Sequence, residues 1–172
     1  MEINIKKILK ISTLLIMSVL IATASATVYR QMRLTGTISV TAPKLVWIEG
    51  EDADATIDGN IATISLTVEN GTAMNFTSAI YLKNDNQTGY FNYNITIIDG
   101  LLSSDFEIAK IHIYDNETTD WSYCGTIDLT NTNSYYVDTL NAGFYLRFTV
   151  EIKAIESPPS DNQFIIKVEY WP

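Results

Sequence analysis

The residues able to do chemistry are few in this 172-residue chain, which contains a single histidine and a single cysteine. His112 lies in the alternating stretch Ile111-His112-Ile113, and Cys124 is distant from it in the sequence. One imidazole and one thiol do not supply the ligands of a zinc site. The chain also lacks H-E-x-x-H, G-x-S-x-G and a glycine-rich phosphate loop. We therefore predict no enzyme activity, no catalytic residues and no cofactor, and we interpret Cys124 as a small buried residue.

One acidic stretch, EGEDADATIDGN, is the candidate for a metal site. Carboxylates are the preferred ligands of calcium, and the spacing Asp-x-Asp is how many calcium loops begin. However, Ile57 stands where such a loop needs glycine, and Thr63 stands where it needs a bidentate glutamate. A plain solvated turn is the alternative interpretation. The candidate calcium ligands are Glu51, Asp52, Asp54 and Asp58.

The motif N-x-[ST], the acceptor for N-linked glycans, occurs five times. Asn94 falls on the polar face of an alternating strand, and the other four asparagines lie in or beside predicted turns. All five positions are therefore expected to reach solvent, as glycan acceptors on a secreted protein must. The glycosylation candidates are Asn70, Asn75, Asn86, Asn94 and Asn116.

The first residues have the layout of a secretory signal peptide. Three lysines precede the apolar run Ile11–Ala22, and the small-residue signal Ala24-Ser25-Ala26 follows it. We expect cleavage after Ala26, so that residues 1–26 form the signal peptide and the protein is secreted to the extracellular cell surface. The alternative is an uncleaved anchor, because the 18 residues Ile11–Val28 approach the length of a spanning helix.

Charge limits the range of partners. The leader holds three lysines and one glutamate, so its removal takes the net charge from −9 to −11. A chain this acidic is not expected to bind nucleic acid or an anionic membrane surface. Contact with a membrane is expected only through the signal peptide or an uncleaved anchor.

Alternation of apolar and polar residues dominates the rest of the chain and predicts half-buried strands. Turn residues such as Asn70-Gly71 and Asp99-Gly100 separate the strands, and no segment shows the 3.6-residue period of a helix. The fold class is therefore all-β, a single antiparallel β-sandwich or jelly roll of about nine to ten strands in residues 42–172. The clearest strands are 64–69, 91–97, 144–153 and 164–170.

A long strand-like segment, residues 27–41, follows the leader directly. Its apolar residues share one parity, and Gly36 in mid-strand indicates close approach by another backbone or by bulky side chains. Such a strand can pair within its own domain. It can also protrude and complete the sheet of a neighbouring copy, as a donor strand does. The residue pattern allows both. The candidate donor residues are Val28, Met32, Leu34, Gly36, Ile38 and Val40.

Three stretches resemble archaeal filament proteins related to the bacterial biofilm fibre protein TasA, the bundling pili and surface threads. They are the A-S-A leader running into Thr35–Val40, the segment Ile80–Gln87, and the segment Leu140–Ala154, in which a Leu-x-x-Gly turn precedes a long strand. The resemblance implies jelly-roll subunits joined by N-terminal donor strands, with Val28–Val40 as donor. Some relatives of TasA are classed as metalloproteases, but this chain has no metal motif to match them. Type IV pilins fit poorly, because Lys10, rather than Gly or Ala, precedes the apolar run.

The leading hypothesis is a structural subunit of an extracellular filament or pilus, serving adhesion or biofilm formation. Its partners are further copies of the same chain, and it carries N-glycans. The alternative, from a different class, is a monomeric, membrane-anchored surface module that binds carbohydrate or protein.

Overall fold

The computed structural model describes residues 31–40, 45–58, 61–118, 120–155 and 161–172, without the side chains of residues 31–33, 39, 40 and 161. The predicted signal peptide and Val28 lie outside these residues. Residues Gln31–Pro172 form one compact unit. Its described part contains eleven strands and no helix, which confirms the prediction of an all-β fold.

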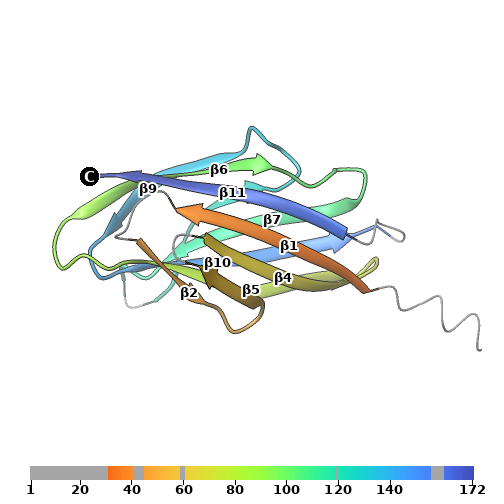
Figure 1. Cartoon of the computed structure of the whole chain (residues 1–172), viewed down its shortest axis with the longest axis horizontal. Helices are drawn as coiled ribbons and strands as arrows, with labels where there is room; N and C mark the ends of the chain where they lie inside the picture. Colours follow the sequence, from red (N-terminus) through yellow and green to blue (C-terminus); the bar gives the residue numbers. More distant parts are fainter. Residues whose placement is uncertain (1–30, 41–44, 59–60, 119, 156–160) are drawn as a thin grey trace, which may run out of the picture. The chain divides into compact units, whose positions relative to one another are not determined.

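Six strands form sheet A, in the spatial order β3, β4, β1, β11, β6 and β9. The neighbours β4 and β11, far apart in sequence, lie on either side of β1 (Figure 1). The bounds of these strands are β1 Gln31–Val40, β3 Asp54–Asp58, β4 Ile61–Glu69, β6 Tyr90–Asp99, β9 Tyr135–Asn141 and β11 Asp161–Trp171.

Five strands form sheet B, in the order β2, β5, β10, β7 and β8. All four of its strand pairs are antiparallel. The bounds are β2 Leu45–Glu49, β5 Ala73–Asn84, β7 Phe106–Asp115, β8 Ser122–Asp128 and β10 Tyr145–Ala154.

One hydrophobic core lies between the two sheets and takes side chains from both. The alternation of apolar and polar residues along each strand decides which side chains enter this core. In β10, the side chains that point inward are Leu146, Phe148, Val150 and Ile152, whereas Arg147 and Glu151 are only partly buried. The pairing of β7 with β10 is irregular at Lys153 and Ala154, opposite Ile108 and Phe106. This irregularity accounts for the change of phase in the apolar pattern of β7.

The structure differs from the sequence-based expectation at β1. The described part of this strand does not protrude but lies inside sheet A, paired on both sides. Its partner β11 runs parallel to it, while every other pair in sheet A is antiparallel. The physical reason is that Leu34 and Ile38 are apolar and become fully buried there, while the ladders on both sides satisfy the backbone.

Candidate functional site

The place that β1 occupies in sheet A is the first candidate site, and we call the space between β4 and β11 the slot. In it β1 pairs antiparallel with β4, from Gln31 opposite Glu69 to Ser39 opposite Ile61. On the other side it pairs parallel with β11, from Arg33 to Val40. Among the described strands, β1 is the only hydrogen-bonded connection between β3–β4 and β11–β6–β9. Sheet A is therefore continuous only while a strand fills the slot.

The side chains of β1 that enter the slot are apolar. Leu34 and Ile38 have exposed fractions of 0%, and Gly36 lies between them on the same face. The walls of the slot come from the inward residues of its two neighbours, among them Ile64 and Phe164. Each fully buried Leu or Ile stabilises the filled slot by roughly 1.5–3 kcal/mol, as an upper value. Of the other predicted donor residues, Met32 and Val40 take part in the ladder, and Val28 lies outside the described residues.

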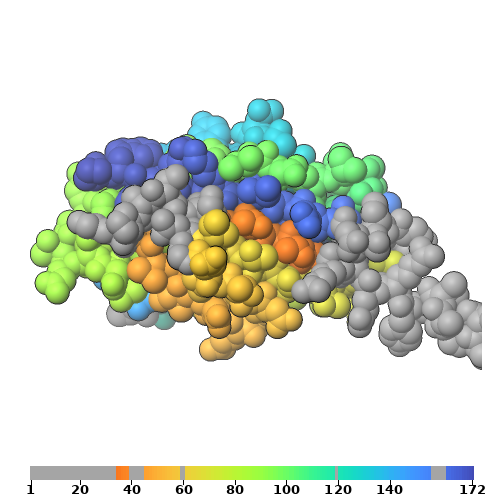
Figure 2. All heavy atoms as spheres, viewed as in Figure 1, coloured from red at the N-terminus to blue at the C-terminus, as the bar shows by residue number. Residues whose placement is uncertain are grey.

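The tightest contact in the slot is between Gly36 and Phe164. A Cβ built on Gly36 would lie 2.3 Å from Cζ of the Phe164 ring and 2.6 Å from Cε2. Because Phe164 is fully buried, its ring has little room to move away. The glycine therefore lets an aromatic ring of β11 pack directly over the backbone of β1. Figure 2 shows β1 in orange at the surface between the yellow atoms of β4 and the blue atoms of β11.

The five sequons differ in how far they reach solvent. Asn75 on β5 is exposed, whereas the other four asparagines are only partly exposed. The side chain of Asn116 is already engaged, because its Oδ1 accepts a hydrogen bond of 2.7 Å from the backbone N–H of Tyr145. Asn94 lies inside sheet A between β11 and β9, and its Oδ1 is buried with no hydrogen-bond partner among the described residues. On accessibility alone, Asn75 is the position best placed to carry a glycan.

The acidic residues proposed as calcium ligands are brought together only in part. Glu51, Asp52 and Asp54 line one surface hollow, but Asp58 lies at the far end of β3. Among the described residues, no three His, Cys, Asp or Glu side chains are placed to hold a metal ion. Asp52 instead accepts hydrogen bonds from the Thr77 hydroxyl at 2.6 Å and the Ser78 N–H at 2.9 Å, which lower its pKa. Through these hydrogen bonds Asp52 holds the connection between β2 and β3 against β5.

The thiol of Cys124 is half-buried beside acidic groups. Its Sγ donates to Oδ2 of Asp115 at 3.1 Å. Burial first, and then this carboxylate, raise the pKa of Cys124 to about 12. The thiol is therefore protonated at neutral pH and is a poor nucleophile there.

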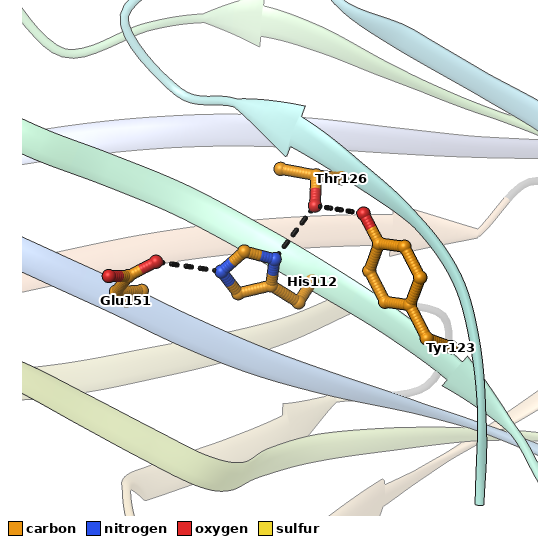
Figure 3. Close-up of polar contacts among 4 residues, drawn as sticks. All are labelled: His112, Tyr123, Thr126 and Glu151. Carbon is orange, nitrogen blue, oxygen red and sulfur yellow. Dashed lines mark hydrogen bonds and ion pairs between the residues drawn. The ribbon is translucent and has the colours of Figure 1, made fainter.

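The histidine belongs to a row of polar contacts across the outer face of sheet B (Figure 3). Nε2 of His112 lies 2.9 Å from Oε2 of Glu151, and Nδ1 lies 2.7 Å from Oγ1 of Thr126. Oγ1 of Thr126 is also 2.7 Å from the Tyr123 hydroxyl. Since an ionised carboxylate only accepts, we assign the ring proton to Nε2, so that a neutral His112 accepts from Thr126 and Thr126 accepts from Tyr123. These contacts tie β10, β7 and β8 together side by side.

A second group on the outer face of sheet B is built around Arg147, and sequence analysis did not identify it as a candidate site. We define the aromatic face as Tyr81, Tyr114, Trp121, Tyr123 and Arg147. Arg147 lies opposite Tyr81 on one side and opposite Tyr114 on the other, and Tyr114 lies opposite Tyr123. The row therefore crosses from β5 through β10 and β7 to β8.

The guanidinium of Arg147 is held between two rings of the aromatic face. Its Cζ lies 4.7 Å from the ring centroid of Tyr114 and 4.7 Å from that of Trp121. Tyr81 packs against Trp121 with centroids 5.8 Å apart, and Tyr123 packs edge-on against Tyr114 at 5.6 Å. Alternation predicted that Arg147 faces outward, but which rings it meets depends on the cross-strand register.

The part of the chain that the structure describes contains no helix long and apolar enough to cross a membrane. No protein-family model matches the chain, and no curated protein matches it.

Proposed function

We propose that this chain is the structural subunit of an extracellular filament, a jelly-roll domain whose N-terminal strand fills the slot of a neighbouring copy. Secretion through the predicted leader and the resemblance to TasA-like filament proteins support the same proposal. In the filament, the strand that contains Leu34, Gly36 and Ile38 is donated from one subunit to the next.

The observation that carries the proposal is the slot between β4 and β11. It is narrow, apolar and fitted to one strand: Phe164 lies over Gly36, and both neighbouring strands present backbone groups to the strand between them. Without that strand, β4 and β11 would each expose an unpaired edge, a configuration that leads to association with other chains. The slot therefore needs a strand, and every copy of the chain carries one that fits.

The pairing contacts are the same whether β1 comes from its own chain or from another copy. Only the covalent connection differs, and it consists of four residues, Thr41 to Lys44, between β1 and β2. A copy that donates its strand leaves its own slot open for the next copy. The contact joins two different surfaces, so repetition gives an open, head-to-tail filament rather than a closed dimer.

The test is removal of the strand followed by its return as a separate molecule. The protein lacking residues 27–41 should be poorly folded or should aggregate. Burial of Leu34 and Ile38 alone, at roughly 1.5–3 kcal/mol each, is large against a typical domain stability of about 5–15 kcal/mol. A synthetic peptide of residues 27–41 should restore a folded monomer that does not polymerise, whereas the intact protein should form fibres visible by electron microscopy.

The proposal fails if the intact protein stays monomeric and well folded at high concentration. The same conclusion follows if residues 27–41 are protected from proteolysis in that monomer. The strand would then belong to its own sheet, and the alternative of a monomeric surface-binding module would take its place.

A further inference from the structure

We propose that the aromatic face binds a sugar chain that carries carboxylate groups, with Arg147 as the residue that recognises the carboxylate. The face lies on sheet B, whereas the slot lies on sheet A. The proposal goes beyond assembly and holds whichever chain supplies β1.

Among the described residues, Arg147 is a cation without an acidic partner. The described residues include three lysine–carboxylate pairs, at Lys83, Lys153 and Lys167, but no carboxylate lies within ion-pairing distance of Arg147. This is unexpected in a chain with 20 acidic and 11 basic residues, where a nearby carboxylate would be easy to provide. The charge at this place is therefore open to a carboxylate from another molecule.

The stacking leaves only part of the guanidinium available. Its Cζ lies close to the centroids of both Tyr114 and Trp121, and its Nε is buried with no hydrogen-bond partner among the described residues. In this proposal the terminal N–H groups bind the carboxylate, and the two neighbouring rings limit the orientations of the guanidinium. A planar, fixed pair of N–H donors is the arrangement that matches the two oxygens of a carboxylate.

The rings around Arg147 provide the second half of the site. Trp121 has an exposed fraction of 36% and Tyr123 of 59%, so both present ring surface to solvent. A pyranose ring carries C–H groups on one side that pack flat on an aromatic ring, while its hydroxyls point outward. The neighbouring row of His112, Thr126 and Glu151 adds polar groups at the edge of the same face, next to Tyr123.

A sugar suits this face better than an acidic peptide does. Acidic peptide motifs are usually recognised by clusters of arginines, and other peptides by a free strand edge or a groove. Across the row from β5 to β8, the outward residues are instead aromatic, and the aliphatic residues of β10 and β7 point into the core. Rings that can pack against the C–H side of a pyranose, beside a cation that can pair with its carboxylate, therefore favour an acidic sugar.

The experiment measures binding of a short oligomer of galacturonic acid to the full chain, purified as the cell produces it. The same oligomer with its carboxylates methyl-esterified is the matched neutral ligand, and a glutamate oligomer of equal charge is the matched peptide. We expect the acid sugar to bind at least tenfold more tightly than either. We also expect its binding to shift the NMR signals of the Trp121 indole and to weaken as salt is raised.

Three variants test the two residues. Arg147→Gln and Trp121→Ala should each weaken binding of the acid sugar at least tenfold, and Arg147→Lys, which keeps the charge but not the planar fork, should weaken it as well. Tyr135→Ala is the control, because Tyr135 is an aromatic residue with an exposed fraction of 66% on sheet A, and it should bind like the wild type. Thermal unfolding of each variant shows that the fold is intact, and the NMR shifts of the wild-type protein need no variant at all.

The proposal is overturned if the acid sugar does not bind or if it binds no better than its methyl ester. It is also overturned if the glutamate oligomer binds as tightly as the acid sugar, since the rings would then not distinguish a sugar from a peptide. Undiminished binding in a folded Arg147→Gln variant would have the same consequence.

Discussion

The slot in sheet A and the aromatic face on sheet B are both built from side chains on neighbouring strands, but they are constrained in different ways. In the slot, Leu34 and Ile38 are fully buried and the Phe164 ring lies against Gly36, so that shape decides what fits. On the aromatic face, the rings are half-buried or exposed, and they stack on Arg147 without forming a closed cavity. Changes in the slot are therefore expected to affect folding and assembly, and changes on the face to affect binding alone.

The largest effect is expected from the buried residues of β1. Leu34→Ala and Ile38→Ala should each lower the free energy of unfolding by about 2–5 kcal/mol, because each leaves a cavity in the slot. The control variants are Thr35→Ala and Thr37→Ala, whose side chains alternate with the buried ones and point away from the core. The free energy of unfolding of these two control variants should stay within about 0.5 kcal/mol of the wild-type value. Urea unfolding measures all four, and equal losses in both pairs would contradict the placement of β1.

The second largest effect is expected from Gly36→Val. This change should lower the free energy of unfolding by about 1–3 kcal/mol, because the added Cβ would overlap the Phe164 ring. Fibre formation should fall as well, since β1 no longer fits either its own slot or that of a neighbour. A double variant with Phe164→Ala should be less destabilised than the sum of the two single changes. Strict additivity in this cycle would show that the two residues do not meet.

The row of polar contacts in Figure 3 should contribute less to the free energy of unfolding than the buried residues of the slot do. His112→Ala removes the contacts to Glu151 and Thr126 and should cost about 1 kcal/mol, because both are partly exposed hydrogen bonds. Tyr123→Phe removes only the contact to Thr126 and should cost less than that. Chemical denaturation compares the two variants, and a loss for His112→Ala as large as that for Leu34→Ala would remove the distinction between the two regions.

The smallest effect on stability is expected at the aromatic face itself. Trp121→Ala should lower the free energy of unfolding by no more than about 1 kcal/mol, the usual size of an exposed cation–π contact. Fibre formation should be unchanged, because Trp121 directly precedes β8 of sheet B and takes no part in the slot. Thermal unfolding and electron microscopy check both points, and a loss of fibres would show that this surface serves assembly.

Local alternation made the strands predictable, since it depends only on neighbouring residues. The pattern of β10 placed Phe148 inward and Arg147 outward, and both lie so. The parallel pairing of β1 with β11 was not predictable, because the two strands lie at opposite ends of the chain and no local signal fixes their register. For the same reason Gly36 indicated a close approach, but the sequence did not identify Phe164 as the ring involved. The Arg147 stack likewise depends on contacts between β10, β7 and the residues just before β8.

The measurement that tests strand donation most directly is a disulfide between β1 and β4. Thr37 of β1 lies opposite Thr63 of β4 in the antiparallel ladder, and both side chains are partly exposed. The variant carries Thr37→Cys and Thr63→Cys, with Cys124→Ala so that only the new pair can oxidise, and each single cysteine serves as a control. If β1 is donated, oxidised fibres should give a ladder of covalent multimers on a non-reducing gel, and reduction should return it to monomer. A disulfide found only within single chains would contradict the account, because β1 would then fill the slot of its own subunit.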